Sequence, residues 1–301
     1  LEDGNIGVYV GATEVGQGAK TILAQIAAEV LGLKVEDVYI FCESTDNTPD
    51  SGTAAASRQT YNTGNAVKNA CEALKERLIL LAKEKLGLNS TTGLRVENKR
   101  VFFRSLPKLE IDFSSIERSF KDNPLRFEGT FIAGTTKMEE ETGQGAPYWP
   151  YTFSVYGVEV EVDTSTGLVE VIKAICAQDV GRAINPELVE GQIDGGFAMG
   201  VGYTIHEDLN LYKGEIINDR FSSYIIPTAL DIPDINKILV EEPEETSPYG
   251  AKGIGEPVML AVAPAILNAI YNATRVRMTE IPVTPDRLLK AIKDQEMTGG
   301  N

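Results

Sequence analysis

The sequence predicts a mixed α+β protein. Short segments with alternating apolar residues, typical of strands, are interspersed with longer segments whose apolar residues recur at helical spacing. Glycine-bearing loops separate these segments. The chain of 301 residues can form one large domain or two moderate ones. A polar, weakly patterned stretch between residues 87 and 125 predicts a soft boundary between a first lobe, 1–126, and a second lobe, 127–301.

The first lobe is expected to begin with a strand, a glycine-bearing loop and a helix. Ile6 to Val10 alternates like a strand after an Asp3-Gly4 turn. Arg58 to Leu86 carries an apolar face at helical spacing and predicts one long helix. The other elements expected in this lobe are a helix over residues 21–30, a strand over 38–42 and short strands near 95–96 and 101–103.

The second lobe is expected to contain a hairpin around Asp163–Gly167 and a helix with Asn185 as its N-cap and Pro186 in its first turn. Glycines repeat at helical spacing within that helix, which predicts a bare side packed closely against a neighbour or a ligand. These glycines are Gly191, Gly195, Gly196 and Gly200. The elements expected are strands over 127–132, 153–162 and 168–175, a hairpin over 209–217, and helices over 186–199, 258–274 and 287–292.

Composition excludes several functions. The net charge of −16 argues against nucleic acid and anionic membrane as partners, and we find no apolar run close to the roughly 20 residues that span a bilayer. Cys42, Cys71 and Cys176 are widely spaced, so they form no local four-cysteine metal site and suit a reducing compartment such as the cytoplasm. His206 is the only histidine, which leaves little for Ser-His-Asp chemistry or histidine-rich metal sites.

Three loops could hold an anionic ligand. The loop Gly11–Gly18 resembles a P-loop, but Ala19 separates Gly18 from Lys20, so the motif fails on spacing. Its glycines could still present free amides to an anion, although a plain strand–helix turn is equally consistent. The segment Thr45–Thr60 contains a run of small, hydroxyl-rich residues, Ser51–Ser57, and leads into a helix whose first turn carries Arg58 and Gln59. It suits either a bulky phosphate-bearing ligand or a flexible surface loop. The third loop is Asp179–Pro186, with Arg182 as an anion contact.

A glutamate stands at the end of a further glycine-rich loop. Glu256 follows Gly253-Ile-Gly255 and precedes Pro257 and an apolar helix. The glycines let this loop approach a ligand closely, and the carboxylate would then face whatever the loop binds. The structural alternative is that Glu256 only complements the dipole of the following helix.

Taken together and in this order, the motifs resemble the molybdenum hydroxylases of the xanthine dehydrogenase and aldehyde oxidase family. The resemblance implies the C-terminal half of that family's molybdopterin-binding domain, in two lobes. Met199 departs from the family, whose members often carry glutamine there. The matching motifs are Gly16-Gln17-Gly18 after Thr13-Glu14, the small-residue loop ending at Ser57, Asp179-Val-Gly-Arg-Ala-Ile-Asn-Pro186, Glu190-Gly-Gln192 and Gly253-Ile-Gly-Glu-Pro257.

The resemblance also assigns roles to residues. It implies that Glu256 is the general base and that molybdenum is held through the pterin dithiolene, with no side chain of this chain as a direct ligand. The residues that it assigns to the cofactor are Gly16, Gln17, Gly18, Thr53, Ala54, Ala55, Ala56, Ser57, Arg58, Gln59, Gln192, Gly253 and Gly255.

The activity implied is hydroxylation of an N-heterocycle or an aldehyde with oxygen derived from water. The cofactor is molybdopterin with molybdenum, in the cytosine dinucleotide form usual for bacterial relatives. Iron–sulfur clusters and FAD are expected on partner subunits, and a large molybdopterin subunit is expected to complete the active site. Within the family, the chain looks most like the medium molybdopterin subunit of a nicotinate dehydrogenase. The competing hypotheses are a piece of a longer single-chain enzyme, a non-catalytic scaffold subunit and a stand-alone phosphate-binding protein.

Overall fold

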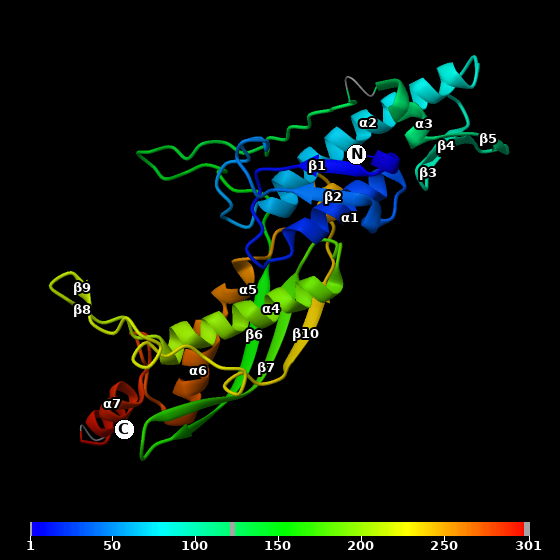
Figure 1. The fold of residues 1–301 in the computed structure, drawn as a ribbon. Helices are drawn as coiled ribbons and strands as arrows, with labels where there is room; N and C mark the ends of the chain where they lie inside the picture. Colours follow the sequence, from blue (N-terminus) through cyan, green and yellow to red (C-terminus); the bar gives the residue numbers. More distant parts are fainter. Residues whose placement is uncertain (1, 121–123, 298–301) are drawn as a thin grey trace. The chain divides into compact units, whose positions relative to one another are not determined.

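The computed structural model describes residues 2–120 and 124–297, which fold into two compact units (Figure 1). The first unit comprises Leu1–Tyr151 and Pro243–Gly253, and the second Thr152–Glu242 and Ile254–Asn301. This division differs from the boundary expected at residue 126. Residues 127–151 and 243–253 belong to the first unit because they bond to its helices: Asn69 donates to the Thr130 carbonyl and Asn65 to the Thr246 carbonyl.

The first unit begins with a parallel strand pair joined by a helix, as expected. The long helix over 58–86 opens with a π-helical turn, Gln59–Thr63, before it becomes regular. The third strand of the antiparallel sheet was not predicted. The elements are β1 (Ile6–Tyr9), α1 (Ala19–Leu31), β2 (Val38–Phe41), α2 (Gly64–Lys85), β3 (Leu94–Glu97), β4 (Arg100–Phe103), β5 (Leu106–Asp112) and α3 (Phe113–Glu117), with β1 parallel to β2 and β3-β4-β5 antiparallel.

The strand predicted over residues 127–132 is wrong. This segment is irregular and lies along α2 instead of pairing with a strand. Gly129 allows the close approach, because a Cβ there would lie 2.0 Å from the Ala66 carbonyl oxygen. The helix side chain of Asn69 takes the place of a strand partner by bonding the Thr130 carbonyl at 2.9 Å.

The second unit packs helices on a three-stranded sheet of order β10-β7-β6 (Figure 1). The Asp163–Gly167 hairpin is confirmed, whereas β10 was not predicted. The predicted helix over 258–274 is broken at Ala261, whose ψ of −1° interrupts the helical path. The elements are β6 (Ser154–Asp163), β7 (Leu168–Asp179), α4 (Pro186–Val201), β8 (Leu211–Tyr212), β9 (Glu215–Ile216), β10 (Ile235–Val240), α5 (Pro257–Leu260), α6 (Val262–Thr274) and α7 (Pro285–Met297), with β6 antiparallel and β10 parallel to β7.

One side of helix α4 has no side chains at its glycine positions, as the glycine spacing predicts. A Cβ on Gly196 would lie 2.4 Å from Val258 Cγ2, and one on Gly200 would lie 2.5 Å from Val262 Cβ, so α4 packs backbone-close on α5 and α6. A Cβ on either of the other two glycines of the repeat would meet no atom within 4 Å, so both of these positions face open space. Asn185 caps α4 as expected, accepting a hydrogen bond from the Leu188 amide at 3.1 Å.

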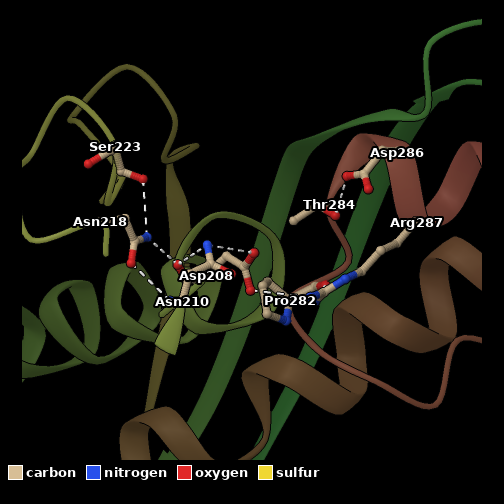
Figure 2. A network of polar contacts seen from close by, with 8 residues as sticks. All are labelled: Asp208, Asn210, Asn218, Ser223, Pro282, Thr284, Asp286 and Arg287. Carbon is tan, nitrogen blue, oxygen red and sulfur yellow. Dashed lines mark hydrogen bonds and ion pairs between the residues drawn. The ribbon is translucent and has the colours of Figure 1, made fainter. Parts of the chain in front are cut away.

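A long irregular segment, 207–231, is fixed to the second unit by a polar network (Figure 2). Asn218 is buried and its side chain bonds the Asn210 amide and the Asp208 and Ser223 carbonyls. Arg287 of α7 pairs with the Asp208 carboxylate at 3.3 Å and donates to the Pro282 carbonyl. The segment therefore has a defined path although most of it lacks regular secondary structure.

By length and composition alone, the stretch Pro257–Thr274 could cross a membrane. Its helix is interrupted at Ala261, and Val262, Ile266 and Ile270 are fully buried in the core of the second unit. Only 22% of the stretch is buried, so these residues form the inner faces of two helices that pack on the core. The expectation that no apolar run approaches the length of a membrane span is therefore wrong for this stretch.

The packing of α4 yields a paired stability prediction. Gly200→Ala places a methyl group against Val262 and should lower the free energy of unfolding by about 1–3 kcal/mol. Gly195→Ala adds the same methyl group in open space. This substitution should raise the free energy of unfolding by about 0.5–1 kcal/mol, because alanine favours a helix more than glycine does. Urea unfolding of both variants measures the difference, and equal effects of the two substitutions would contradict this packing.

Candidate cofactor cradle

The loop between β1 and α1 is folded around a carboxylate of its own. Glu14 Oε1 accepts hydrogen bonds from the amides of Gly16 and Gly18, at 2.8 and 3.0 Å, and Oε2 accepts from the Lys20 amide at 2.9 Å. Burial opposes ionisation of Glu14, but these amides and the Lys20 charge outweigh it and hold the pKa of the carboxyl below its usual value. The carboxylate of Glu14 therefore satisfies these amides and offsets the positive end of the α1 helix dipole.

The expectation that this loop presents free amides to an anion is therefore wrong for Gly16, Gly18 and Lys20. Their amides are already bonded to Glu14. The lysine side chain is also engaged, because Lys20 forms an ion pair with Glu43. A stand-alone phosphate site at the start of α1 loses its physical basis.

The structure brings Gln17 and Gln59 together, although 42 positions separate them in the sequence. Gln17 Nε2 donates to Gln59 Oε1 at 2.6 Å, and both side-chain amides donate to the Thr13 carbonyl. Gln17 Oε1 accepts from the Val15 amide at 2.7 Å. The two glutamines thus join the glycine loop to the start of the long helix.

The small-residue loop is shaped by the arginine that follows it. Arg58 Nε donates to the Ala55 carbonyl at 3.1 Å, and Nη2 donates to the Thr53 carbonyl at 3.0 Å. Ala56 and Ser57 have φ angles of 58° and 50°, in the left-handed region that costs non-glycine residues about 1–3 kcal/mol. Strained residues of this kind cluster at functional sites.

Gly253 is packed directly onto this loop. A Cβ on Gly253 would lie 1.7 Å from the Ser57 carbonyl oxygen, so no other residue fits there without a shift of the backbone. The two loops, nearly 200 positions apart in the sequence, are therefore built as one surface of the first unit.

Asn62 is a candidate residue that sequence reasoning missed. It lines a small hollow together with Ala54, Arg58 and Gln59, and its Oδ1 is buried without a hydrogen-bond partner among the described residues. A buried polar atom without a partner is costly, and a ligand that donates a hydrogen bond would satisfy it. The signal lies in the π-helical turn Gln59–Thr63, which a sequence pattern does not distinguish from a regular helix.

The remaining predicted residues belong to the second unit. Gln192 is half-buried on α4, and Met199 of the same helix is 60% exposed. Gly255 and Glu256 are exposed at the start of α5, and the Glu256 side chain forms no cap hydrogen bond to that helix. Arg182 is exposed as well, but the Ala183 amide beside it donates to the Glu241 carboxylate, which weakens that loop as an anion site.

Comparisons with known proteins identify the family of this chain. A sequence model of the family described as "Molybdopterin cofactor-binding domain" matches residues 1–233. The putative xanthine dehydrogenase molybdenum-binding subunit XdhA of Escherichia coli K12 is 34% identical over 298 residues, covering 95% of this chain and 38% of its own. The gamma subunit of the 6-hydroxypseudooxynicotine dehydrogenase complex of Paenarthrobacter nicotinovorans is 29% identical, covering 95% of this chain and 36% of its own.

A solved structure shows the same fold. Quinoline 2-oxidoreductase from Pseudomonas putida 86 superimposes with a TM-score of 0.77 at 30% identity, covering 96% of this chain and 36% of that one. The chain therefore belongs to the molybdopterin-binding proteins of the xanthine dehydrogenase and aldehyde oxidoreductase family, as its motifs predict. It spans less than two fifths of the length of these relatives.

The role of Glu14 gives a prediction that depends on pH. A lowered pKa in the folded state means that the ionised carboxylate stabilises the fold above its unfolded pKa of about 4.3 and ceases to do so as pH falls through the folded value. Glu14→Gln should lower the free energy of unfolding by about 1–2 kcal/mol at pH 7, the scale of a lost helix cap, and by much less below pH 4. Urea unfolding across pH tests this, with Glu84→Gln on the exposed side of α2 as control. Parallel pH profiles for the two variants would refute it.

Proposed function

We propose that this chain is the base-bearing half of the molybdopterin site in a molybdenum hydroxylase. The observation that supports this most directly is the packing of Gly253 against Ser57, which fixes the loop leading to Glu256 to the small-residue loop. Gly255 and Glu256 follow within three residues, and an extended chain covers at most about 11 Å over that span. The chain connection alone therefore limits the distance between the Glu256 backbone and the Gly253–Ser57 contact to about 11 Å.

The residues of the first unit fit a pterin-type cofactor with a phosphate-bearing tail. Asn62 Oδ1 needs a donor, which the amino and ring N–H groups of a pterin provide. The small side chains of Ala54, Ala55 and Ala56 leave backbone accessible to a bulky ligand. The side-chain amides of Gln17 and Gln59 offer both donors and acceptors beside them. The phosphate belongs on the small-residue loop, beside the cationic Arg58, because Glu14 already occupies the start of α1.

Within this proposal, the cofactor supplies the redox chemistry when it is bound. Glu256 acts as general base, with its carboxylate accepting a proton from the water-derived oxygen that is transferred to the substrate. Gly253 and Gly255 let the backbone on either side of Ile254 approach the ligand closely. We propose Gln192, on α4, as a further contact to the pterin. Because α4 packs on α5 at Gly196 and Val258, the position of Gln192 is coupled to the start of the helix that Glu256 precedes.

We further propose that the active protein is an assembly. A large molybdopterin subunit or adjoining segment completes the cofactor site, and partner subunits carry iron–sulfur clusters and FAD. The substrate is an N-heterocycle of the nicotinate kind or an aldehyde, and the pterin is in the cytosine dinucleotide form. The names of the gamma subunit of a dehydrogenase complex and of quinoline 2-oxidoreductase support a multi-subunit enzyme and a heterocyclic substrate, respectively.

Replacement of the proposed base tests this function directly. Glu256→Gln in the assembled enzyme should lower kcat at least about a hundredfold, the scale of general-base loss, with the molybdenum and pterin content unchanged. Steady-state kinetics and metal analysis measure the two quantities. Glu280→Gln, at an exposed glutamate away from the glycine loop, is the matched control. Near-normal turnover of Glu256→Gln would eliminate this assignment and favour a scaffold role.

Asn62 is tested by cofactor retention. Asn62→Ala removes the unsatisfied acceptor and should weaken cofactor binding about five- to tenfold, the scale of one hydrogen bond. The fluorescence of the released, oxidised pterin per mole of protein measures the loss after dialysis. Asn69→Ala, further along α2 and bonded to Thr130, serves as control. If the two variants retained equal amounts of cofactor, Asn62 would have no place in the site.

A further inference from the structure

The sheet of the second unit has one covered face and one bare face. Along β6 and β7 the inward residues are buried, as shown by Tyr156 and Cys176, and they pack on the helices. Toward the Phe153 end of β6 the outward residues of the three strands are apolar, whereas the hairpin half of the same face carries Glu159, Glu161, Glu170 and Lys173. We define this outer sheet face by Phe153, Val155, Ile175, Ala177, Ile238 and Val240.

The apolar side chains of the outer sheet face form a continuous row. Val155 is paired in register with Ala177, and Ala177 with Ile238, so the row crosses all three strands. Val155 is 68% exposed and Ile238 47% exposed. A sheet face left to water normally carries polar residues, and parallel pairs such as β7–β10 are normally covered on both faces. The outer sheet face therefore has the composition of a buried surface.

The hairpin end of the same face carries an unbalanced acidic pair. Glu161 of β6 lies directly opposite Glu170 of β7, and both side chains are exposed. Like charges in this position repel one another. Within residues 2–120 and 124–297 no Lys or Arg forms an ion pair with either of them. Lys173 is the basic residue beside this pair, but it lies directly opposite Glu159 and not opposite Glu161. The three glutamates therefore outnumber the one lysine, and a cation from outside the described chain would relieve the repulsion that remains.

The missing polypeptide is the occupant that these observations favour. The same fold makes up only 36% of the quinoline 2-oxidoreductase chain, and the match to XdhA covers 38% of that relative. A second copy of this chain would bring a net charge of −16 to an acidic pair, which a basic segment complements better. Three strands about 4.8 Å apart offer a surface wide enough for one helix, about 10 Å in diameter.

We propose that the outer sheet face is the docking surface for the rest of the molybdenum-binding region. Its occupant is a segment with an apolar face toward Val155 and Ile238 and with Lys or Arg side chains toward Glu161 and Glu170. This inference rests on the proposed function, because it takes the partner to be the polypeptide that completes the cofactor site. It adds the surface through which that polypeptide binds and the chemistry of the binding segment.

Photo-cross-linking in the assembled, cofactor-loaded enzyme tests the docking surface. A photoreactive amino acid is placed at Val155 or Ile238, and the cross-linked peptides are identified by mass spectrometry. The expected product joins these positions to a peptide outside the 301 residues, from the remaining molybdenum-binding region, with Lys or Arg beside apolar residues. Cross-links to this chain's own peptides would indicate a second copy and overturn the proposal. So would cross-links only to iron–sulfur or flavin subunits, or none in enzyme that turns over normally.

A charge reversal separates docking from simple repulsion within the hairpin. Glu170→Lys creates an opposite-charge pair with Glu161. If the acidic pair recruits a cation from the partner, this variant should dissociate from the assembly at lower salt or urea concentration than the wild type. Glu76→Lys, at an exposed position of α2, makes the same change of charge elsewhere. If Glu170→Lys assembled as well as Glu76→Lys and melted at a higher temperature, the pair would be a local repulsion only. Turnover and molybdenum content of the wild-type assembly, measured alongside, show whether the proposed function itself stands.

Discussion

The close approach of Gly253 to the Ser57 carbonyl is the constraint on which the first unit depends. It holds two strained residues, Ala56 and Ser57, in the left-handed conformation that gives the small-residue loop its shape. The segment around Gly253 is itself built into the unit. Thr246 bonds the Tyr61 hydroxyl and the Asn65 side chain, both of which are buried. Without the returning segment these two polar groups would lose their partners, and the loop would lose its support.

Charge within the cradle is arranged by the chain itself. Glu14 takes the amides that the start of α1 would offer to a ligand, so the positive end of that helix is satisfied internally. Arg58 binds loop carbonyls through Nε and Nη2, which fixes the position of its guanidinium beside the small residues. This acidic protein thereby keeps a cation, Arg58, at one loop and an internally bonded anion, Glu14, at the other. In the proposed function, this difference is what orients a ligand that has a neutral ring and a charged tail.

Most regular elements could be predicted, because their apolar periodicity is set by the surface that each one buries. In two of the segments where the prediction failed, the partner lies far away in sequence. Residues 127–132 alternate like a strand, but Gly129 places them against α2, and β10 was missed because its parallel partner, β7, is remote in sequence. The proposed site residues were suggested by their motifs, whereas Asn62 was not, because what distinguishes it is a buried oxygen atom without a hydrogen-bond partner among the described residues. The role of Glu14 was missed for a similar reason: which group satisfies an amide is decided by loop geometry and not by residue type.

The first unit is built from two separate segments of the chain, and this affects how it can fold during synthesis. Residues 243–253 complete this unit, yet the ribosome adds them after almost the whole of the second unit's sheet has been synthesised. Tyr61 and Asn65 can therefore form their hydrogen bonds to Thr246 only after some 180 further residues have been synthesised. Domains generally fold as units from the N-terminal end during synthesis. This protein departs from that order, because the first unit cannot complete its fold until the sheet of the second unit has been synthesised. Folding of the first unit is therefore linked to synthesis of the second.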